Sequence, residues 1–245
     1  WRPSLPDRRD IPYTVRYAGP LPALVDTSVP DLGSPWSPIW DQQSLGSCGS
    51  QTWAADIIHA ALRKQNLPSV PMPSRLFGYY TTRMIMGTTQ YDSGVDNRSM
   101  LKAANRYGWC DEAIWPYDIT RFAMRPPDKC FVQAAPRKIL QYFKVAQTPD
   151  TMRGALASGD PFIFGFSVHA NFDDVGPDGI VPMPSGPQVG GHDVLFVGYD
   201  DGTRLFKFRN SWGSGWGDRG YGYMPYAIAF DPGMSQDFWS VKHSA

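Results

Sequence analysis

The stretch that decides the fold is Gln42-Gln43-Ser44-Leu45-Gly46-Ser47-Cys48-Gly49-Ser50, a turn rich in glycine and serine that ends in a cysteine. Apolar residues then recur at helical spacing, at Trp53, Ile57, Ile58 and Ala61. They predict an amphipathic helix that begins near Cys48 and ends by Asn66-Leu67-Pro68. A cysteine in the first turn of a helix meets unpaired N–H groups and the positive end of the helix dipole, which favour the thiolate. A lone cysteine is more often a small buried side chain, so its chemistry depends on the rest of the chain.

Length and charge bound the function classes. A chain of 245 residues lies near the upper end of what one core supports, so one domain with two lobes and two small domains are both compatible. Lys+Arg and Asp+Glu each number 23, which removes any global electrostatic argument for nucleic acid or an anionic membrane. The longest apolar runs are strand-sized, far short of the roughly 20 residues of a bilayer helix. We therefore expect a monomer with no nucleic-acid partner and no membrane.

Cysteines and acidic residues give no framework for disulfides or metals. Three cysteines, Cys48, Cys110 and Cys130, leave at least one unpaired, and a bridge between the last two and two free thiols both stay open. The acidic turn of residues 92–96 fits no calcium-loop pattern, so we expect no metal and no cofactor. The sequence begins at Trp1 without a recognisable signal peptide, and we expect that a segment upstream is missing from it.

The order of elements predicts an α+β fold. Four prolines within residues 1–20 predict an N-terminal extension without a core of its own, for which a surface strap and a regulatory segment are both open. Helical patterns follow over 74–86 and 98–107. Buried strands are predicted at 162–168 and 193–199, and the second turns through Asp200-Asp201-Gly202 into a hairpin partner at 204–209. A helical first half thus precedes a β-rich second half.

The β-rich half supplies partners for a thiol nucleophile, which needs a base, a group that orients the base, and donors for an oxyanion. His192 is predicted at the start of a strand after Gly190-Gly191. Asn210 follows the next strand, so the hairpin can bring His192 and Asn210 together. Asn210 also opens a run of Trp and Gly over 210–217 that core packing alone does not explain.

These motifs resemble the papain family of cysteine peptidases, in a bacterial form without the usual disulfides. The matching pieces are Leu-Pro-Ala-Leu-Val-Asp (21–26), Asp-Gln-Gln-Ser-Leu-Gly-Ser-Cys (41–48), Trp-Pro-Tyr (115–117), Gly-His-Asp-Val-Leu-Phe-Val-Gly-Tyr (191–199) and Arg-Asn-Ser-Trp-Gly-Ser-Gly-Trp-Gly-Asp-Arg-Gly-Tyr (209–221). The resemblance implies an extension at 1–20 and a peptidase domain at 21–245, with a helical lobe over about 41–125 and a β-barrel-like lobe over about 126–245. The active site would lie in the cleft between the lobes.

The resemblance also implies the catalytic roles. Cys48 would attack the scissile carbonyl as a thiolate, with His192 as its ion-pair partner and the acid that protonates the leaving amine. Asn210 would orient the imidazole, and Trp212 would shield their hydrogen bond from water. Gln42 would join the Cys48 backbone N–H in the oxyanion hole. Partners would be protein or peptide substrates.

One departure concerns the residue after the nucleophile. The family signature Cys-Gly-[Ser/Ala]-Cys-[Trp/Tyr] overlays on residues 48–52 with Gln51 at the nucleophile position, which would make the chain inactive. In the other register Cys48 is the nucleophile, and Gln42 then lies six residues before it, as the oxyanion glutamine requires. This register is favoured, and it leaves Gly49 where the family has tryptophan, so a more open cleft floor is expected.

Substrate contacts follow from the resemblance alone. Gly94 and Val95 would offer backbone hydrogen bonds to an extended peptide. Gly165 and Gly191 would border a roomy main pocket, for which an apolar or aromatic P2 side chain is expected, and Trp216 would line the leaving-group side. Two other functions stay open: an inactive homologue that binds peptide or carbohydrate, and an acyltransferase or amidase with the same site geometry.

Overall fold

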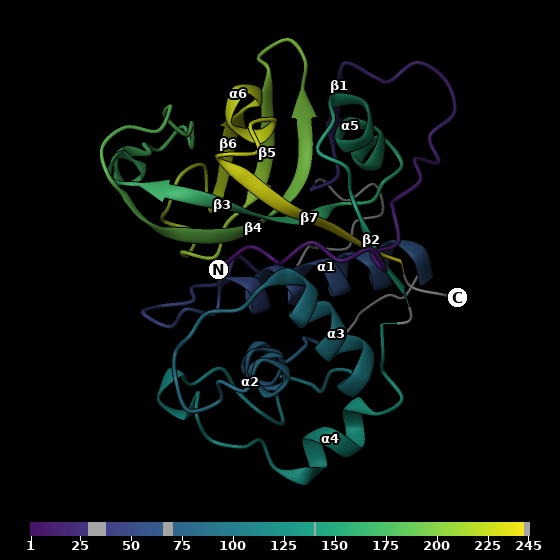
Figure 1. Ribbon diagram of the computed structural model, residues 1–245, viewed down its shortest axis with the longest axis vertical. Coiled ribbons are helices and arrows are strands. Elements are labelled where there is room, and N and C mark those ends of the chain that lie inside the picture. The colour runs from purple at the N-terminus through teal and green to yellow at the C-terminus, as the bar shows by residue number, and fades with distance from the viewer. Residues whose placement is uncertain (29–37, 66–70, 140, 243–245) are drawn as a thin grey trace.

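A computed structural model describes residues 1–28, 38–65, 71–139 and 141–242. Figure 1 shows α2, α3 and α4 on one side of α1, and the strands together with α5 and α6 on the other. The helices are α1 (Cys48–Gln65), α2 (Arg75–Met86), α3 (Asn97–Tyr107), α4 (Asp128–Ala134), α5 (Pro149–Ala157) and α6 (Tyr226–Ala229), with 3-10 turns at Ile119–Arg121 and Ala170–Asp174. The strands are β1 (Leu24–Asp26), β2 (Gln141–Lys144), β3 (Phe162–His169), β4 (Gln188–Asp200), β5 (Leu205–Arg209), β6 (Tyr221–Pro225) and β7 (Ser235–Lys242).

The β-rich lobe is one antiparallel sheet with the order β2-β7-β3-β4-β5-β6, and β1 pairs with β4. Strand β4 starts at Gln188, five residues before the predicted start at Asp193. The prediction was wrong there because the two glycines do not end the strand: Gly190 and Gly191 pair with Val168 and Ser167 of β3.

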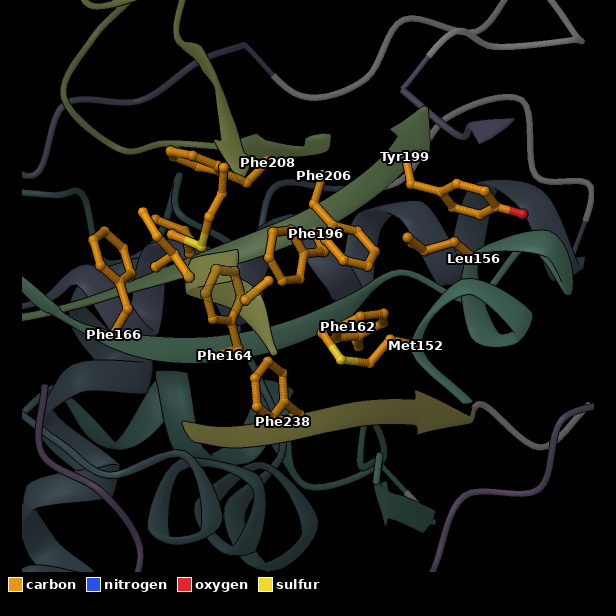
Figure 2. Packing of buried hydrophobic residues seen from close by; sticks show 14 of the residues in the cluster. Met152, Leu156, Phe162, Phe164, Phe166, Phe196, Tyr199, Phe206, Phe208 and Phe238 are labelled. Atoms are coloured by element: carbon orange, nitrogen blue, oxygen red, sulfur yellow. The ribbon is translucent and has the colours of Figure 1, made fainter. Parts of the chain in front are cut away.

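Alternation along β3 and β4 divides their side chains between two cores. Even-numbered residues such as Phe164 and Phe196 enter an aromatic core within the β-rich lobe, where their rings stack 3.8 Å apart (Figure 2). Odd-numbered residues such as Ile163 and Leu195 face the helical side and share a second core with Trp53 of α1. His192 and Asp193 follow one another on β4, so their side chains leave the strand on opposite faces.

The helical lobe has a third core, to which α4 also contributes. Cys130 and Ala134 of α4 are buried in the cluster that holds Leu76 and Phe77 of α2, and the Phe77 and Phe131 rings meet edge to face at 5.1 Å. These contacts join α4 to the helical lobe, although it lies beyond the limit of about residue 125 drawn from the sequence. An apolar face on α4 explains the difference, because it packs against α2 and against Tyr107 at the end of α3.

The N-terminal extension runs between the two lobes, as the purple trace in Figure 1 shows. Tyr13 anchors it: the ring enters the aromatic core and the hydroxyl donates to Asp160 at 2.6 Å. A buried cross-lobe contact lies further toward the start of the chain, where Arg98 of α3 forms an ion pair with Asp10. The extension therefore contacts both lobes.

Candidate active site

Cys48 is the first residue of α1 and is almost fully buried. The helix begins there because the Ser47 carbonyl accepts from the backbone N–H groups of Ser50 and Gln51, at 2.9 and 3.2 Å. The Gln51 side chain is also buried and lies against Ser47 and Arg75. The first turn of the helix thus holds the thiol, while Gln51 is engaged in the helical lobe.

His192 and Asn210 meet across adjacent strands, as the hairpin pattern predicted. The two are joined by a hydrogen bond of 2.7 Å between Nε2 and Oδ1. The same Asn210 oxygen accepts from the backbone N–H of Ser211 at 2.8 Å. Because a backbone N–H can only donate, the atom that faces both groups is the amide oxygen, and His192 Nε2 carries the hydrogen. In the neutral ring, Nδ1 is then the nitrogen free to act as a base.

Aromatic rings enclose this imidazole. Trp212 lies across it with centroids 4.8 Å apart and 33° between the planes, and Phe166 meets it edge to face at 5.8 Å. Burial lowers the pKa of His192 to about 4, although the hydrogen bond to Asn210 acts in the opposite direction and raises it. The imidazole is therefore neutral near pH 7 while the site is closed in this way.

The residues that follow Cys48 and His192 are in direct contact. A Cβ on Gly49 would lie 3.1 Å from Asp193 Oδ2, and Thr52 Oγ donates to the carbonyls of both Cys48 and Asp193, at 2.9 and 3.1 Å. These contacts hold the start of α1 against the middle of β4. Cys48 and His192 are thereby positioned on neighbouring elements.

The expected opening in the floor below Gly49 is wrong. A Cβ at this position would lie 2.7 Å from a Val95 methyl carbon, 3.1 Å from the Asp193 carboxyl and 3.4 Å from the Met100 sulfur. These three side chains occupy the volume that a larger residue would take. A side chain at position 49 would require Val95 to move, so the packing favours glycine there.

Asp193 is a buried carboxyl that the sequence did not single out. Asn97 Nδ2 donates to its Oδ1 at 3.0 Å, and Oδ2 has no hydrogen-bond partner. Burial, and then the nearby charge of a Cys48 thiolate, raise the pKa of Asp193 well above its usual range. A protonated carboxyl here avoids a second negative charge beside the thiol.

Gln42 is held next to the Asn-Ser-Trp segment. Its Oε1 accepts from Ser211 Oγ at 2.7 Å, its Nε2 donates to Leu45 O at 3.0 Å, and its backbone N–H donates to Ser211 O at 2.8 Å. The Leu45 carbonyl can only accept, so it fixes which end of the amide is nitrogen, and the Ser211 hydroxyl then donates to the oxygen. One hydrogen of Nε2 remains after the bond to Leu45.

Trp1 brings four of the predicted substrate-contact residues together. Its indole occupies the space beside Gly165 and Gly191, where a Cβ would lie 1.9 and 2.9 Å from ring atoms. Its backbone nitrogen donates to Gly191 O at 3.4 Å and lies 3.7 Å from Cys48 Sγ. A Cβ on Gly94 would lie 3.3 Å from that nitrogen. The next residue donates its N–H to Val95 O at 3.2 Å, so all four positions border the start of the extension.

Comparison with known proteins identifies this arrangement. Residues 22–240 match the family described as papain family cysteine protease. The chain belongs to this family. It is 38% identical over 214 residues to an uncharacterised peptidase C1-like protein of Acanthamoeba polyphaga mimivirus, an alignment that covers 82% of this chain and 68% of the viral protein.

Solved structures agree. Xylellain, a cysteine protease from Xylella fastidiosa, is 36% identical and superposes with a TM-score of 0.89 over 100% of this chain and 96% of that one. Digestive procathepsin L 3 of Tenebrio molitor is 20% identical, with a TM-score of 0.76 over 96% of this chain and 74% of that one, which shows the shared fold alone. The chain is thus a papain-like cysteine protease with a two-lobed α+β fold.

Trp216, the other predicted substrate-contact residue of this papain-family chain, contacts Trp212, which in turn packs on His192. Trp216 stacks on Phe172 at 5.8 Å and meets Trp212 edge to face.

Within the described residues, no group of three or more His, Cys, Asp or Glu could hold a metal ion. Among the same residues, no helix combines the length and the apolar character that crossing a bilayer needs.

Proposed function

We propose that this papain-family protease is an endopeptidase in which Cys48 is the nucleophile, His192 the base and acid, and Asn210 the residue that orients the imidazole. The hydrogen bond between His192 Nε2 and Asn210 Oδ1 carries this proposal, because it leaves Nδ1 to accept the thiol proton. The thiolate then attacks the scissile carbonyl, and the histidine proton goes to the leaving amine.

Gln42 is proposed as the side-chain donor of the oxyanion hole, together with the Cys48 backbone N–H. The Ser211 hydroxyl orients the amide, and Nε2 keeps one hydrogen for the oxygen of the tetrahedral intermediate. Donors fixed before the reaction stabilise developing charge without reorganisation. A binding module without catalysis is not favoured, since it needs neither the tautomer of His192 nor the fixed amide of Gln42.

Selective labelling tests the nucleophile. A peptidyl epoxide should alkylate Cys48 once it displaces Trp1 from the thiol, because opening the epoxide needs a thiolate beside a histidine. Cys110 and Cys130 are matched internal controls: both are fully buried and free, and burial raises the pKa of each thiol. Peptide mapping should find the label on Cys48 alone, and His192→Ala should lose it. Label on all three thiols, or on none, would contradict the proposed site.

We further propose that the space beside Gly165 and Gly191 is the S2 subsite and that it accepts a large aromatic side chain. The argument is the fit of the Trp1 indole against both glycine Cα atoms. Peptides that differ only at P2 should therefore be cleaved with kcat/KM at least about tenfold higher for Phe than for Arg, since the charged side chain would be desolvated without a partner. A preference for P2 Arg would refute this assignment.

The same contacts suggest an inhibitory role for the N-terminal extension. Trp1 lies in the proposed S2 subsite, and its backbone nitrogen is 3.7 Å from Cys48 Sγ. Arg2 takes the backbone hydrogen bond of Val95 that a substrate would need. A bound peptide must therefore displace the first residues of the extension.

A further inference from the structure

The Trp115-Pro116-Tyr117 motif has no role in the site as described so far, yet its tyrosine touches the loop that carries the oxyanion groups. The Tyr117 hydroxyl donates to the Gln42 carbonyl at 2.9 Å and lies 2.5 Å from Ser47 Oγ. Gln42 and Ser47 are the two ends of the loop that leads into Cys48. One phenol oxygen therefore bridges both ends of this loop.

The direction of each hydrogen bond in this region can be deduced. Arg75 has only donors, so the Gln51 atom 3.1 Å from Arg75 Nη1 is the amide oxygen, and Gln51 Nε2 must donate to Ser47 Oγ at 3.3 Å. The Tyr117 hydrogen is used on the Gln42 carbonyl, so the Ser47 hydroxyl donates to the Tyr117 oxygen. The result is a chain with one direction, from Arg75 through Gln51, Ser47 and Tyr117 to Gln42.

The start of this chain is firmly fixed. The Arg75 guanidinium is paired with Glu112 and lies over the rings of both Trp40 and Tyr117, 4.8 and 4.4 Å from their centroids. Burial raises the pKa of Tyr117 to about 12, so its hydroxyl remains a donor at any working pH. Hydrogen bonds that point the same way polarise one another, and a cation at the donor end strengthens the chain.

We propose that Tyr117 is a positioning residue of the peptidase reaction, which braces the oxyanion loop so that Gln42 and the Cys48 N–H meet the developing oxyanion at a fixed spacing. The inference rests on the proposed function of Cys48 and Gln42. Tyr117 does not touch the substrate. It acts through the loop, in which Gln42 also binds Ser211 on the other side.

Tyr117→Phe tests the brace, since it removes the hydroxyl and keeps the ring under Arg75. We expect kcat to fall about tenfold with KM unchanged, because a misplaced donor is felt mainly in the transition state. A peptide aldehyde, which adds the Cys48 thiol and presents its oxygen to the oxyanion groups, should bind about tenfold more weakly. The matching peptide alcohol, which forms no such adduct, should bind as before.

Tyr199→Phe is the matched control. Its hydroxyl also donates to a backbone carbonyl, that of Pro22 at 2.7 Å, but in the β-rich lobe. It should change neither kcat nor aldehyde binding. If Tyr117→Phe weakened aldehyde and alcohol equally, or left both unchanged, the brace would be refuted. Should Tyr117→Phe fail to fold, Ser47→Ala interrupts the same chain and must give the same split between aldehyde and alcohol.

A double-mutant cycle separates this inference from the proposed function. If Tyr117 acts through Gln42, adding Tyr117→Phe to Gln42→Ala should cost little further activity. Full additivity would contradict the inference. If Gln42→Ala alone left kcat and aldehyde binding unchanged, the oxyanion role proposed for Gln42 would fail, whereas an effect of Gln42→Ala with none of Tyr117→Phe would refute only the brace.

Discussion

His192→Ala is expected to lower kcat/KM by at least about 10⁴-fold, the usual loss when a member of such a catalytic unit is removed. Without the imidazole, Cys48 loses the base that takes its proton, and the leaving amine loses its acid. Steady-state kinetics on a fluorogenic peptide would measure the change. Activity above about 1% of the parent would contradict the assignment of His192.

His169→Ala is the matched control. His169 ends β3, and its ring contacts only the Gly186 carbonyl among the described hydrogen bonds, at 3.0 Å. Its replacement should change kcat/KM less than about twofold, as surface changes usually do. His192→Gln adds a variant that can still donate to Asn210 and fill the space below Trp212. His192→Gln should be as inactive as His192→Ala. Equal losses would show that the missing base, and not collapse of the site around a small side chain, causes the loss of activity.

Replacing His192 by Gln should also change how the stability of the folded chain depends on acidic pH. The pKa of His192 is about 4 in the folded chain and 6.5 when unperturbed, so the unfolded state binds the extra proton first. The parent chain therefore has its full free energy of unfolding above pH 6.5. Proton uptake by the unfolded state lowers this free energy by about 3 kcal/mol as the pH falls from 6.5 to 4. In His192→Gln this loss should be absent. Thermal unfolding at pH 4 and pH 7 would measure it.

The central pair was predictable because it depends on local geometry. The turn at residues 200–202 makes β4 and β5 neighbours, which was enough to expect His192 and Asn210 near one another. A register shift between Phe196 and Gly198 then sets which residues face each other at the site, and the sequence pattern did not predict it. The packing at Gly49 could not be predicted in this way. Its space is taken by Val95, Met100 and Asp193, and no periodicity in the sequence relates these positions.

Contacts between distant segments account for the other omissions. Tyr117 stood out within a motif, but its partners Gln42 and Ser47 lie 75 and 70 residues earlier. The prolines of residues 1–20 indicated an extended segment without saying which surface it follows. The location of Trp1 beside Gly165 and Gly191 depends on how the two lobes meet, which only the assembled structure provides.

Deleting residues 1–3 is expected to raise kcat/KM for a peptide substrate by about 30-fold. Burying part of an indole contributes about 2 kcal/mol, and a tethered segment that competes with substrate weakens apparent affinity by the same factor. The gain should lie in KM, because saturating substrate displaces the segment in the parent chain as well. The rate of epoxide labelling at Cys48 should rise equally.

This short deletion isolates inhibition from folding. Removing all of residues 1–20 would also take away Tyr13, which is part of the aromatic core. The short deletion keeps Tyr13, the ion pair between Asp10 and Arg98, and the Ser4 hydroxyl that donates to Asp237 and accepts from the Arg98 N–H. Leu5→Ala is the control, since its side chain is 82% exposed and should not affect either rate. Trp1→Ala should recover most of the gain. If the deletion left both KM and the labelling rate unchanged, the extension would be a strap without an inhibitory role.

The deletion should also change the titration of His192. Burial is the main cause of its low pKa, and Trp1 lies directly against the neighbouring Gly191. When water replaces the indole, the charged imidazole is hydrated and its pKa should move up from about 4 toward 6.5. The proton transfer from Cys48 to His192 then becomes more favourable. An NMR titration of the His192 ring in both chains would measure the shift, and an identical pKa would mean that the extension blocks substrate without altering the state of the catalytic pair.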